Sequence, residues 1–138
     1  MMLIDTYVST SGIHGSGIFT KEKIKKDARI WRFDEGFDVV LIPDQLYSMP
    51  NWQRSFFETY CFMNEGKLYY CCDNARFMNH SENPNTYEKP DGTYAKIDIE
   101  IGEELTCDYA TFGVTQEDFN FNIAIFNTLK ESAKITIK

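Results

Sequence analysis

The sequence predicts a single, mainly β domain with one or two short helices. The chain has 138 residues, a length at which one core removes roughly two-thirds of the unfolded chain's surface from water. Short apolar or β-branched runs alternate with turns rich in glycine, aspartate, asparagine and proline, which is typical of strands joined by tight turns. Hydrophobic residues make up 43% and aromatic residues 15% of the chain, enough for a core throughout and for a ligand channel lined by rings.

Four segments have the composition of strands. They are Leu3 to Val8, Arg29 to Phe33, Asp38 to Ile42 and Leu68 to Cys72. A further pair is expected around Tyr87 and Tyr94, because residues 89–93 between them contain Pro90, which fixes φ, and Gly92, which accepts a positive φ.

One helix is predicted from Asn51 or Trp52 to about Met63. Four large apolar residues recur there at spacings of three to four, namely Trp52, Phe56, Tyr60 and Met63. Asn51 is suited to cap the helix start, and the apolar stripe is expected to face the core.

A second helix is predicted after Thr115. Thr115 and Asp118 are suited to frame its N-terminus, and Phe119, Ile123 and Phe126 then share one face.

The charge balance disfavours nucleic acid as a partner. The formal net charge is −7 and the pI is near 4.8, whereas phosphate contacts need clustered lysines and arginines. A basic partner fits better, although composition alone favours ordinary solubility charge as the explanation of the acidity.

The N-terminal residues and the cysteines indicate an intracellular protein. Asp5 follows a very short apolar run, so neither a signal peptide nor a membrane-spanning helix is expected. Four cysteines are present, at positions Cys61, Cys71, Cys72 and Cys107, without the CxxC spacing of a zinc site. We expect reduced, partly buried thiols.

Three segments carry the candidate chemistry. Gly12 to Phe19 is a glycine-rich turn, typical both of a plain tight turn and of a loop whose amides approach an anionic ligand. Arg76 to Asn85 contains Asn79-His80-Ser81, short polar residues whose irregular backbone is able to read an adenine edge. Gly102 to Tyr109 ends a strand-like run in Asp108-Tyr109.

In this order the three segments resemble the signature motifs of the SET-domain lysine methyltransferases, from about residue 11 to residue 112. The resemblance implies a SET-domain fold of several short curved β-sheets, with one or two short helices and a C-terminal pseudoknot at the segment that ends in Tyr109. Chain threading of this kind is rare and does not follow from periodicity.

The resemblance also implies the site residues. Its cofactor would be S-adenosyl-L-methionine, held by His14, Gly15, Ser16, Gly17, Asn79 and His80. Tyr109 would be the catalytic residue that faces the transferred methyl group. Candidates for the rest of a lysine channel are Tyr69, Tyr70, Tyr87 and Phe112, each of which is also compatible with plain core packing.

The chain departs from well-known family members after the second segment. They often carry a cysteine where Glu82 stands, and a cysteine cluster beyond the tyrosine, which together bind zinc; no metal site is therefore expected here. We expect instead that the tail, residues 113–138, packs over the active site. Four phenylalanines supply the apolar surface for this, namely Phe112, Phe119, Phe121 and Phe126.

The expected activity is methyl transfer to a lysine of a basic protein, with a histone-like tail as the leading substrate class and with neither nucleic acid nor membrane as a direct partner. One alternative is an inactive SET-like module that binds peptides. Another is a thiol hydrolase using Cys71 or Cys72 with His80 and Asp73. The target lysine, the number of methyl groups and the oligomeric state do not follow from the sequence.

Overall fold

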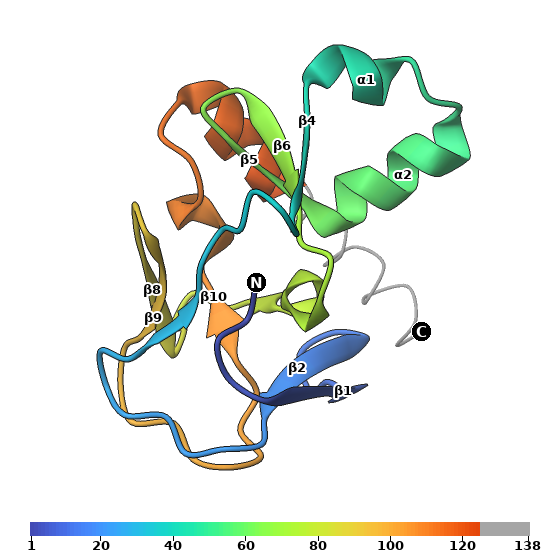
Figure 1. Cartoon of the computed structure of the whole chain (residues 1–138). Helices are drawn as coiled ribbons and strands as arrows, with labels where there is room; N and C mark the ends of the chain where they lie inside the picture. Colours follow the sequence, from blue (N-terminus) through green and yellow to red (C-terminus); the bar gives the residue numbers. More distant parts are fainter. Residues whose placement is uncertain (125–138) are drawn as a thin grey trace.

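In a computed structural model of the protein, which describes residues 1–124, ten short strands form four small sheets (Figure 1). The strands are β1 (Thr6–Thr10), β2 (Ser16–Thr20), β3 (Arg29–Trp31), β4 (Val39–Leu41), β5 (Cys61–Asn64), β6 (Lys67–Tyr70), β7 (Asn79–His80), β8 (Thr86–Lys89), β9 (Gly92–Ala95) and β10 (Thr106–Cys107). The helices are α1 (Pro43–Tyr47) and α2 (Asn51–Tyr60), with 3-10 turns η1 (Asn74–Phe77) and η2 (Tyr109–Thr111). Residues 116–124 are also helical. The predicted mainly β architecture is confirmed.

The sheets are small because most strands span only two to five residues. β1 and β2 form an antiparallel hairpin, and two three-stranded antiparallel sheets have the orders β3-β9-β8 and β4-β6-β5. The β8–β9 hairpin is the pair predicted from the Pro90 and Gly92 turn. The fourth sheet pairs β7 with β10 in parallel, and β10 lies near the centre of the molecule, in contact with β8 (Figure 1).

Hydrogen bonds lock the β7–β10 pair to the loop that follows β7. The Ser81 N–H donates to the Cys107 carbonyl at 2.9 Å. The Asn85 side chain donates to the Glu104 carbonyl at 2.8 Å and accepts from the Thr106 N–H at 2.9 Å. Two segments about twenty residues apart are thus fastened to each other, at the place where the resemblance puts the pseudoknot.

Two hydrophobic clusters hold the sheets together. The first has Ile18, Ile24, Ile30, Ile99 and Leu105 at its centre, all 2% exposed or less. The second consists of Leu46, Cys61, Met63 and Leu68. Burying one such aliphatic side chain stabilises the fold by about 1.5–3 kcal/mol, so these residues determine which face of each strand points inward.

Helix α2 begins at Asn51, as predicted, but its N-cap and its end differ from the prediction. Its N-cap is Pro50, so Asn51 is the first helical residue and not the cap. The helix ends at Tyr60, and the predicted end near Met63 is wrong, because Cys61 is extended and begins a strand that pairs with β6. Pairing with a sheet outweighs the helical periodicity of the sequence here. No helix within residues 1–124 combines the length and the apolarity that crossing a bilayer requires.

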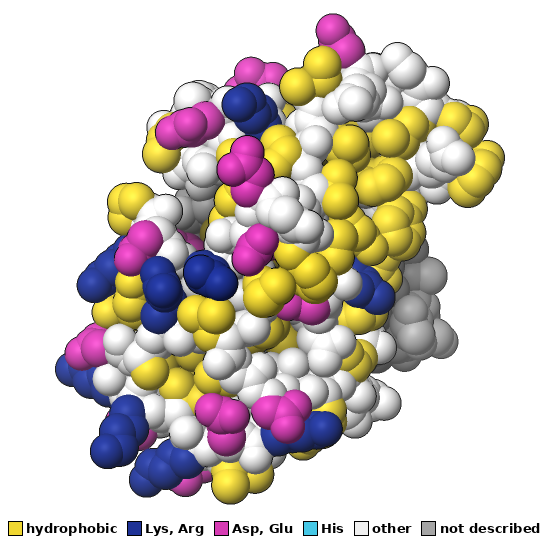
Figure 2. Space-filling view, viewed as in Figure 1, with side chains coloured by type: hydrophobic (Ala, Val, Ile, Leu, Met, Phe, Trp, Pro, Cys, Tyr) yellow, Lys and Arg dark blue, Asp and Glu magenta, His cyan; other side chains and the backbone are white. Residues whose placement is uncertain are grey.

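The apolar stripe predicted for α2 faces the core only in part, because Met63, which lies on β5, is buried and Tyr60 is half-buried, whereas the first two residues of the stripe are exposed. Trp52 is 73% exposed and Phe56 43%. Together with Ile42 and Tyr47 they belong to a surface on which apolar side chains gather over α1 and α2 (Figure 2). The helix lies at the edge of the molecule, and Phe57 provides its packing against the second cluster.

The helix at residues 116–124 confirms the prediction made from Thr115 and Asp118. The Thr115 hydroxyl accepts from the Asp118 N–H, and the Asp118 carboxylate accepts from the Thr115 N–H, each at 3.1 Å, which forms a reciprocal N-terminal cap. Asp118 is 0% exposed and also accepts from the backbone N–H groups of Glu65 at 2.8 Å, Gly66 at 2.9 Å and Val114 at 3.1 Å. One carboxylate therefore joins this helix to the β5–β6 turn.

We predict that Asp118→Asn destabilises the protein by about 3 kcal/mol, since an amide has one acceptor oxygen and charge-assisted hydrogen bonds contribute about 1.5–3 kcal/mol each. Burial acts to raise the pKa of Asp118, but the four backbone N–H groups hold it below its ordinary value. Its stabilisation is therefore present above about pH 4 and is lost as the pH falls through the folded-state pKa. Urea denaturation at pH 7 and pH 3 measures this, and Glu117→Gln, which changes an exposed neighbour, is the control. Equal stability of Asp118→Asn and the wild type at pH 7 would contradict it.

Candidate functional site

Two cavities meet at Tyr109. The larger cavity, of about 480 Å³, has walls that include Trp31, Phe62, Tyr69, Glu88, Tyr109 and Phe112. The smaller cavity, of about 200 Å³, is lined among others by His14, Gly15, Ser16, Phe77, Asn79 and Tyr109. Four further residues border both, namely Thr59, Tyr60, Arg76 and Met78. Tyr109 therefore stands where an aromatic cavity adjoins one built from a glycine turn and an amide.

Tyr109 is held in place by its hydroxyl and by its backbone N–H. Its hydroxyl donates to the Met78 carbonyl at 2.8 Å, and its backbone N–H donates to the His80 ring at 3.0 Å. Burial, together with the nearby Cys107, raises the pKa of Tyr109 well above its ordinary value of 10. The phenol is thus protonated at neutral pH, and its oxygen lone pairs remain available to a ligand.

His80 positions Tyr109 and does not line either cavity. Its Nδ1 accepts the Tyr109 N–H, which assigns the ring proton of the neutral form to the other nitrogen. Burial lowers the pKa of His80, while the negative charges of Asp108 and Glu82 act to raise it, and the net shift is downward. A neutral, hydrogen-bonded ring suits a structural role better than proton transfer.

Asn79 fastens the glycine turn. Its amide group donates to the carbonyls of His14 and Ser16, both at 3.1 Å, and to the Glu104 carboxylate at 3.0 Å. Glu104 also accepts from the Ser11 hydroxyl at 2.7 Å. The turn between β1 and β2 is thereby tied to β7, and the shape of the smaller cavity depends on this contact. Glu104, which the sequence analysis treated as part of a strand, is a second anchor of the turn.

Gly15 and Gly17 of the turn have different functions. Gly15 has φ +46 and nothing within 4 Å of the position that a Cβ would take, so it leaves open space beside the smaller cavity. A Cβ on Gly17 would lie 2.6 Å from the Glu104 carboxylate, and Gly17 does not line either cavity. His14 to Ser16 are therefore placed to meet a ligand, whereas Gly17 makes room for Glu104.

Of the four channel candidates, Tyr69 and Phe112 lie in the larger cavity. Phe62 lies between them, stacked on Tyr69 with ring centroids 5.3 Å apart and packed against Phe112 at 5.0 Å. Phe112 also stacks on Tyr109 at 6.1 Å. An aromatic wall thus extends from β6 to the segment after β10, and Phe62 is a member that the sequence analysis missed.

Tyr70 and Tyr87 lie outside both cavities. Strand alternation turns Tyr70 away from Tyr69 and into the second hydrophobic cluster, where it contacts Phe57 at 5.8 Å. Tyr87 donates to the Asp27 carboxylate at 2.9 Å on the outside of the β8–β9 hairpin. These two tyrosines serve packing and hairpin structure.

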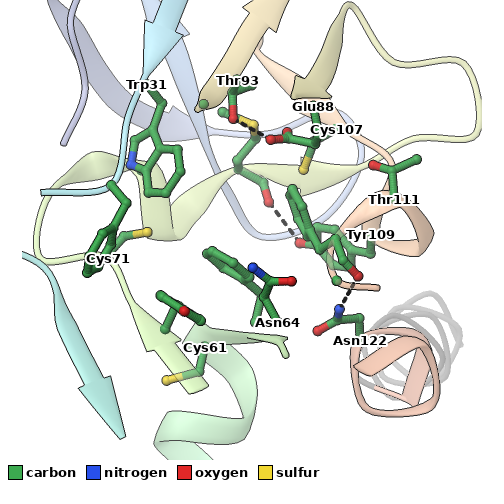
Figure 3. A pocket seen from close by; sticks show the side chains of 18 of the residues that line it. Trp31, Cys61, Asn64, Cys71, Glu88, Thr93, Cys107, Tyr109, Thr111 and Asn122 are labelled. Atoms are coloured by element: carbon green, nitrogen blue, oxygen red, sulfur yellow. Dashed lines mark hydrogen bonds between the residues drawn. The ribbon is translucent and has the colours of Figure 1, made fainter. Parts of the chain in front are cut away.

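Glu88 is a polar residue of the larger cavity that the sequence analysis did not single out. One carboxyl oxygen accepts from the Thr93 hydroxyl at 2.7 Å (Figure 3). The other, Oε1, is shielded from solvent and has no hydrogen-bond partner among residues 1–124. Burial raises the pKa of Glu88 from 4.5 to about 7, and the bond from Thr93 opposes part of that shift. Its signal in the sequence was the period of two in β8, which puts Glu88 on the same inward face as buried Thr86.

The residues proposed for a thiol hydrolase are not arranged as a catalytic site in the structure. Burial raises the pKa of Cys71 far above its ordinary value, so the thiolate is disfavoured. Asp73 accepts from the backbone N–H groups of Met2 and Ala75, and His80 serves Tyr109. All four cysteines are free thiols, and within residues 1–124 no three His, Cys, Asp or Glu side chains are arranged to hold a metal ion.

The described part of the tail closes one side of the larger cavity. Gly113, Val114 and Asn122 are among its wall residues. The Asn122 amide donates to the carbonyls of Phe112 at 2.8 Å and Met63 at 3.1 Å. Two of the four phenylalanines expected to cover the site lie elsewhere, since Phe119 is 42% exposed and Phe121 packs against the second cluster. Phe126 lies outside the described residues.

Comparison with protein families identifies the fold and the motifs together. The SET domain family model matches residues 15–110, which include Gly15 and Gly17 of the glycine turn, Asn79-His80 and Tyr109. The chain belongs to the SET-domain family. This is a family of protein lysine methyltransferases, and the SET-domain fold predicted from the sequence is confirmed. Comparison with curated proteins finds no match.

Solved structures with the SET fold resemble the chain at low sequence identity. An apo Polycomb Repressive Complex 2 from Chaetomium thermophilum, with two substitutions in Ezh2, aligns with a TM-score of 0.64 at 20% identity and covers 79% of this chain and 15% of that one. A humanized form of the same complex bound to the inhibitor GSK126 has a TM-score of 0.60 at 20% identity, with the same coverage. A Plasmodium falciparum protein assigned as a histone methyltransferase has a TM-score of 0.54 at 18% identity, covering 83% of this chain and 96% of that one. The chain spans about 15% of the length of the first two.

We predict that Glu88→Gln stabilises this SET domain at pH 8 by an amount on the order of 1–2 kcal/mol, because a buried charge is replaced by a neutral amide. As the pH rises from 4.5 to about 7, the unfolded chain releases the Glu88 proton before the folded one does, so stability falls over this window. The gain should therefore shrink towards pH 5. Thermal unfolding at both pH values tests this, with the exposed Glu65→Gln as control; a gain that is independent of pH would contradict it.

Proposed function

We propose that this chain is a protein-lysine N-methyltransferase that uses S-adenosyl-L-methionine as its methyl donor. The observation that carries the proposal is that Tyr109 lines two cavities of different chemistry. Methyl transfer from a sulfonium to an amine is an in-line displacement, which needs two reactants to meet at a fixed point from which water is excluded. A half-buried phenol between two cavities supplies such a point.

The smaller cavity is proposed to hold the donor. When bound, S-adenosyl-L-methionine supplies a methyl group activated by its positively charged sulfur. The fit rests on the open space at Gly15, on the turn His14 to Ser16, and on the Arg76 guanidinium and the Phe77 ring, which suit a carboxylate and an adenine. Asn79 keeps the turn in place, and His80 contributes through the position of Tyr109.

The larger cavity is proposed to receive the target lysine. A lysine amine has a pKa of about 10.4 in water and must be neutral to attack, and apolar walls such as Phe62, Tyr69 and Phe112 disfavour its charged form. The Tyr109 hydroxyl donates a hydrogen bond to the Met78 carbonyl, so the lone pairs of its oxygen are left to orient the amine and to accept weak C–H···O contacts of about 0.5–1 kcal/mol each.

The substrate is proposed to be a basic protein segment of the histone-tail type. The net charge of −7 favours a cationic partner, although acidic and basic side chains are intermixed on the face drawn in Figure 2. Among the similar solved structures, one is assigned as a histone methyltransferase and another is a complex that contains Ezh2. We propose an intracellular location, with which the four free thiols agree. We also propose that residues 1–138 form one SET domain.

A catalytically inactive peptide-binding module is the second candidate. It accounts for the larger cavity, but it has no need of Tyr109 at the junction with the smaller one. Incubation with radiolabelled S-adenosyl-L-methionine and a panel of basic peptides separates the two. Label on lysine supports the enzyme, whereas peptide binding in calorimetry without any label supports the module.

We predict that Tyr109→Phe lowers the rate of methyl transfer at least about tenfold, because a phenyl ring lacks the oxygen that orients the amine. Stability should fall by only about 1 kcal/mol, the usual contribution of one hydrogen bond such as that to Met78. Tyr87→Phe, which alters a tyrosine outside both cavities, is the matched control. Wild-type turnover in Tyr109→Phe would remove this tyrosine from the mechanism.

We predict that Asn79→Ala weakens donor binding at least about tenfold, equivalent to about 1.4 kcal/mol. The carbonyls of His14 and Ser16 lose their shared donor, so the glycine turn no longer keeps the shape of the smaller cavity. Isothermal titration calorimetry with S-adenosyl-L-methionine measures the loss. Asn83→Ala, at an exposed position in the following loop, should bind as the wild type does, and equal affinities of the two variants would refute the prediction.

A further inference from the structure

We propose that Glu88 receives the ammonium group of the target lysine in the larger cavity and takes its proton before methyl transfer. This inference rests on the proposed function and adds the group that makes the amine neutral. The aromatic walls lower the cost of a neutral amine, but they do not accept a proton. The carboxylate of Glu88 lies in the wall of the larger cavity and has one oxygen without a hydrogen-bond partner in the described part of the chain, so it is able to accept this proton.

Glu88 lies in a row that crosses one sheet. In the register of β3, β9 and β8, Trp31 is opposite Thr93, and Thr93 is opposite Glu88. Paired strands lie about 4.8 Å apart, so the three side chains are neighbours, and all three line the larger cavity. Figure 3 shows the Glu88 carboxylate pointing toward Thr93 at the edge of this cavity.

The two carboxyl oxygens have different surroundings. Oε2 is fixed by the Thr93 hydroxyl at 2.7 Å, whereas Oε1 is buried without a partner in the described part of the chain. The Trp31 ring nitrogen is also buried and unpaired, but it lies on the side of its ring away from Glu88, so the two do not satisfy each other (Figure 3). An unpaired buried acceptor is unfavourable in the free protein, and a cationic donor that enters the cavity removes that penalty.

Glu88 is close to the segment that carries Tyr109. The pKa of Cys107 on β10 is raised first by burial and then by the charge of Glu88, and Cys107 precedes Tyr109 by two residues. The same thiol contributes to the raised pKa of Tyr109. Glu88 and Tyr109 therefore belong to one electrostatic neighbourhood on the wall of the larger cavity.

The other charged wall residues do not compete for this function. Arg76 and Lys89 are cations, Arg76 being bonded to the Cys72 carbonyl and Lys89 lying over the Tyr94 ring at 4.6 Å. Glu65 is an exposed acid at the rim, which water solvates.

The remaining titratable side chains in the cavity wall are thiols and phenols, which are weak acids. Burial raises the pKa values of the thiols Cys61, Cys71 and Cys107 and of the phenol Tyr109, so these groups keep their protons. The pKa of Glu88 is about 7, which matches the value at which a general base is most effective at neutral pH.

The proton balance of the step is simple. A hydrogen of the lysine ammonium moves to Glu88 Oε1, and the electron pair of the broken N–H bond stays on the nitrogen as its lone pair. That lone pair forms the new bond to the methyl carbon beside Tyr109, and the electrons of the old carbon–sulfur bond remain on sulfur. Glu88 afterwards returns the proton to solvent water.

The test is the pH dependence of kcat/KM between pH 6 and 9 for a basic lysine peptide and radiolabelled S-adenosyl-L-methionine. The wild type should rise to a plateau above about pH 7, because ionised Glu88 accepts the proton of a charged substrate. Glu88→Gln should be at least about tenfold slower at pH 7.5 and should keep rising to pH 9, since only amine that has lost its proton in solution, with a pKa of about 10.4, then reacts. A purely structural role would not change the shape of the profile.

Two further variants sharpen the result. Thr93→Val removes the hydrogen bond that lowers the Glu88 pKa, so the start of its plateau should move to higher pH. Glu117→Gln removes an exposed acid outside both cavities and should keep the wild-type plateau. Circular dichroism and calorimetric donor binding verify that each variant is folded and loaded.

The outcomes separate the two proposals. An active wild type together with a Glu88→Gln variant of the same rate and profile overturns the role of Glu88 and leaves the methyltransferase function standing. A folded wild type that transfers no methyl group to any basic peptide overturns the function and, with it, the role of Glu88. An active wild type, a Glu88→Gln profile without a plateau and a displaced Thr93→Val profile support both.

Discussion

The parallel pairing of β7 with β10 is the constraint on which the site depends. Two residues from each strand bring Asn79 and His80 beside the segment that ends in Tyr109. From there Asn79 reaches the glycine turn, and His80 fixes the backbone of Tyr109. Such a short pair is not stable by itself, so the bonds from Ser81 and Asn85 and the packing of Leu105 in the first cluster are needed to hold it.

The polar groups at the site differ in whether they stabilise the fold or remain open to a ligand. Asn79, Glu104 and His80 make hydrogen bonds within the fold and keep the cavities in shape. Glu88 is different, because one of its oxygens is buried and unpaired. Natural folds leave few such groups, and those that remain are commonly connected with binding or reaction. The contrast between satisfied anchors and one open acceptor distinguishes the frame of this site from the part that meets a ligand.

The sequence was sufficient for the fold class, for the β8–β9 hairpin and for the helix after Thr115, because turn and capping residues act locally. It failed at the end of α2 and for the exposure of Trp52, since sheet pairing and the place of a helix in the molecule are not local properties. The same limit applied to the channel. Composition could not tell Tyr69 from Tyr70, whose directions depend on strand register, and it did not reveal that Gly17 accommodates Glu104.

The contribution of Asn122 to the larger cavity has a consequence for biosynthesis. This residue joins the carbonyls of Met63 and Phe112, and Asp118 holds the β5–β6 turn from the same helix. A nascent chain therefore cannot complete its pocket while that helix is still inside the ribosomal exit tunnel. A product that stops before this helix would expose aromatic surface to chaperones instead of gaining a working centre.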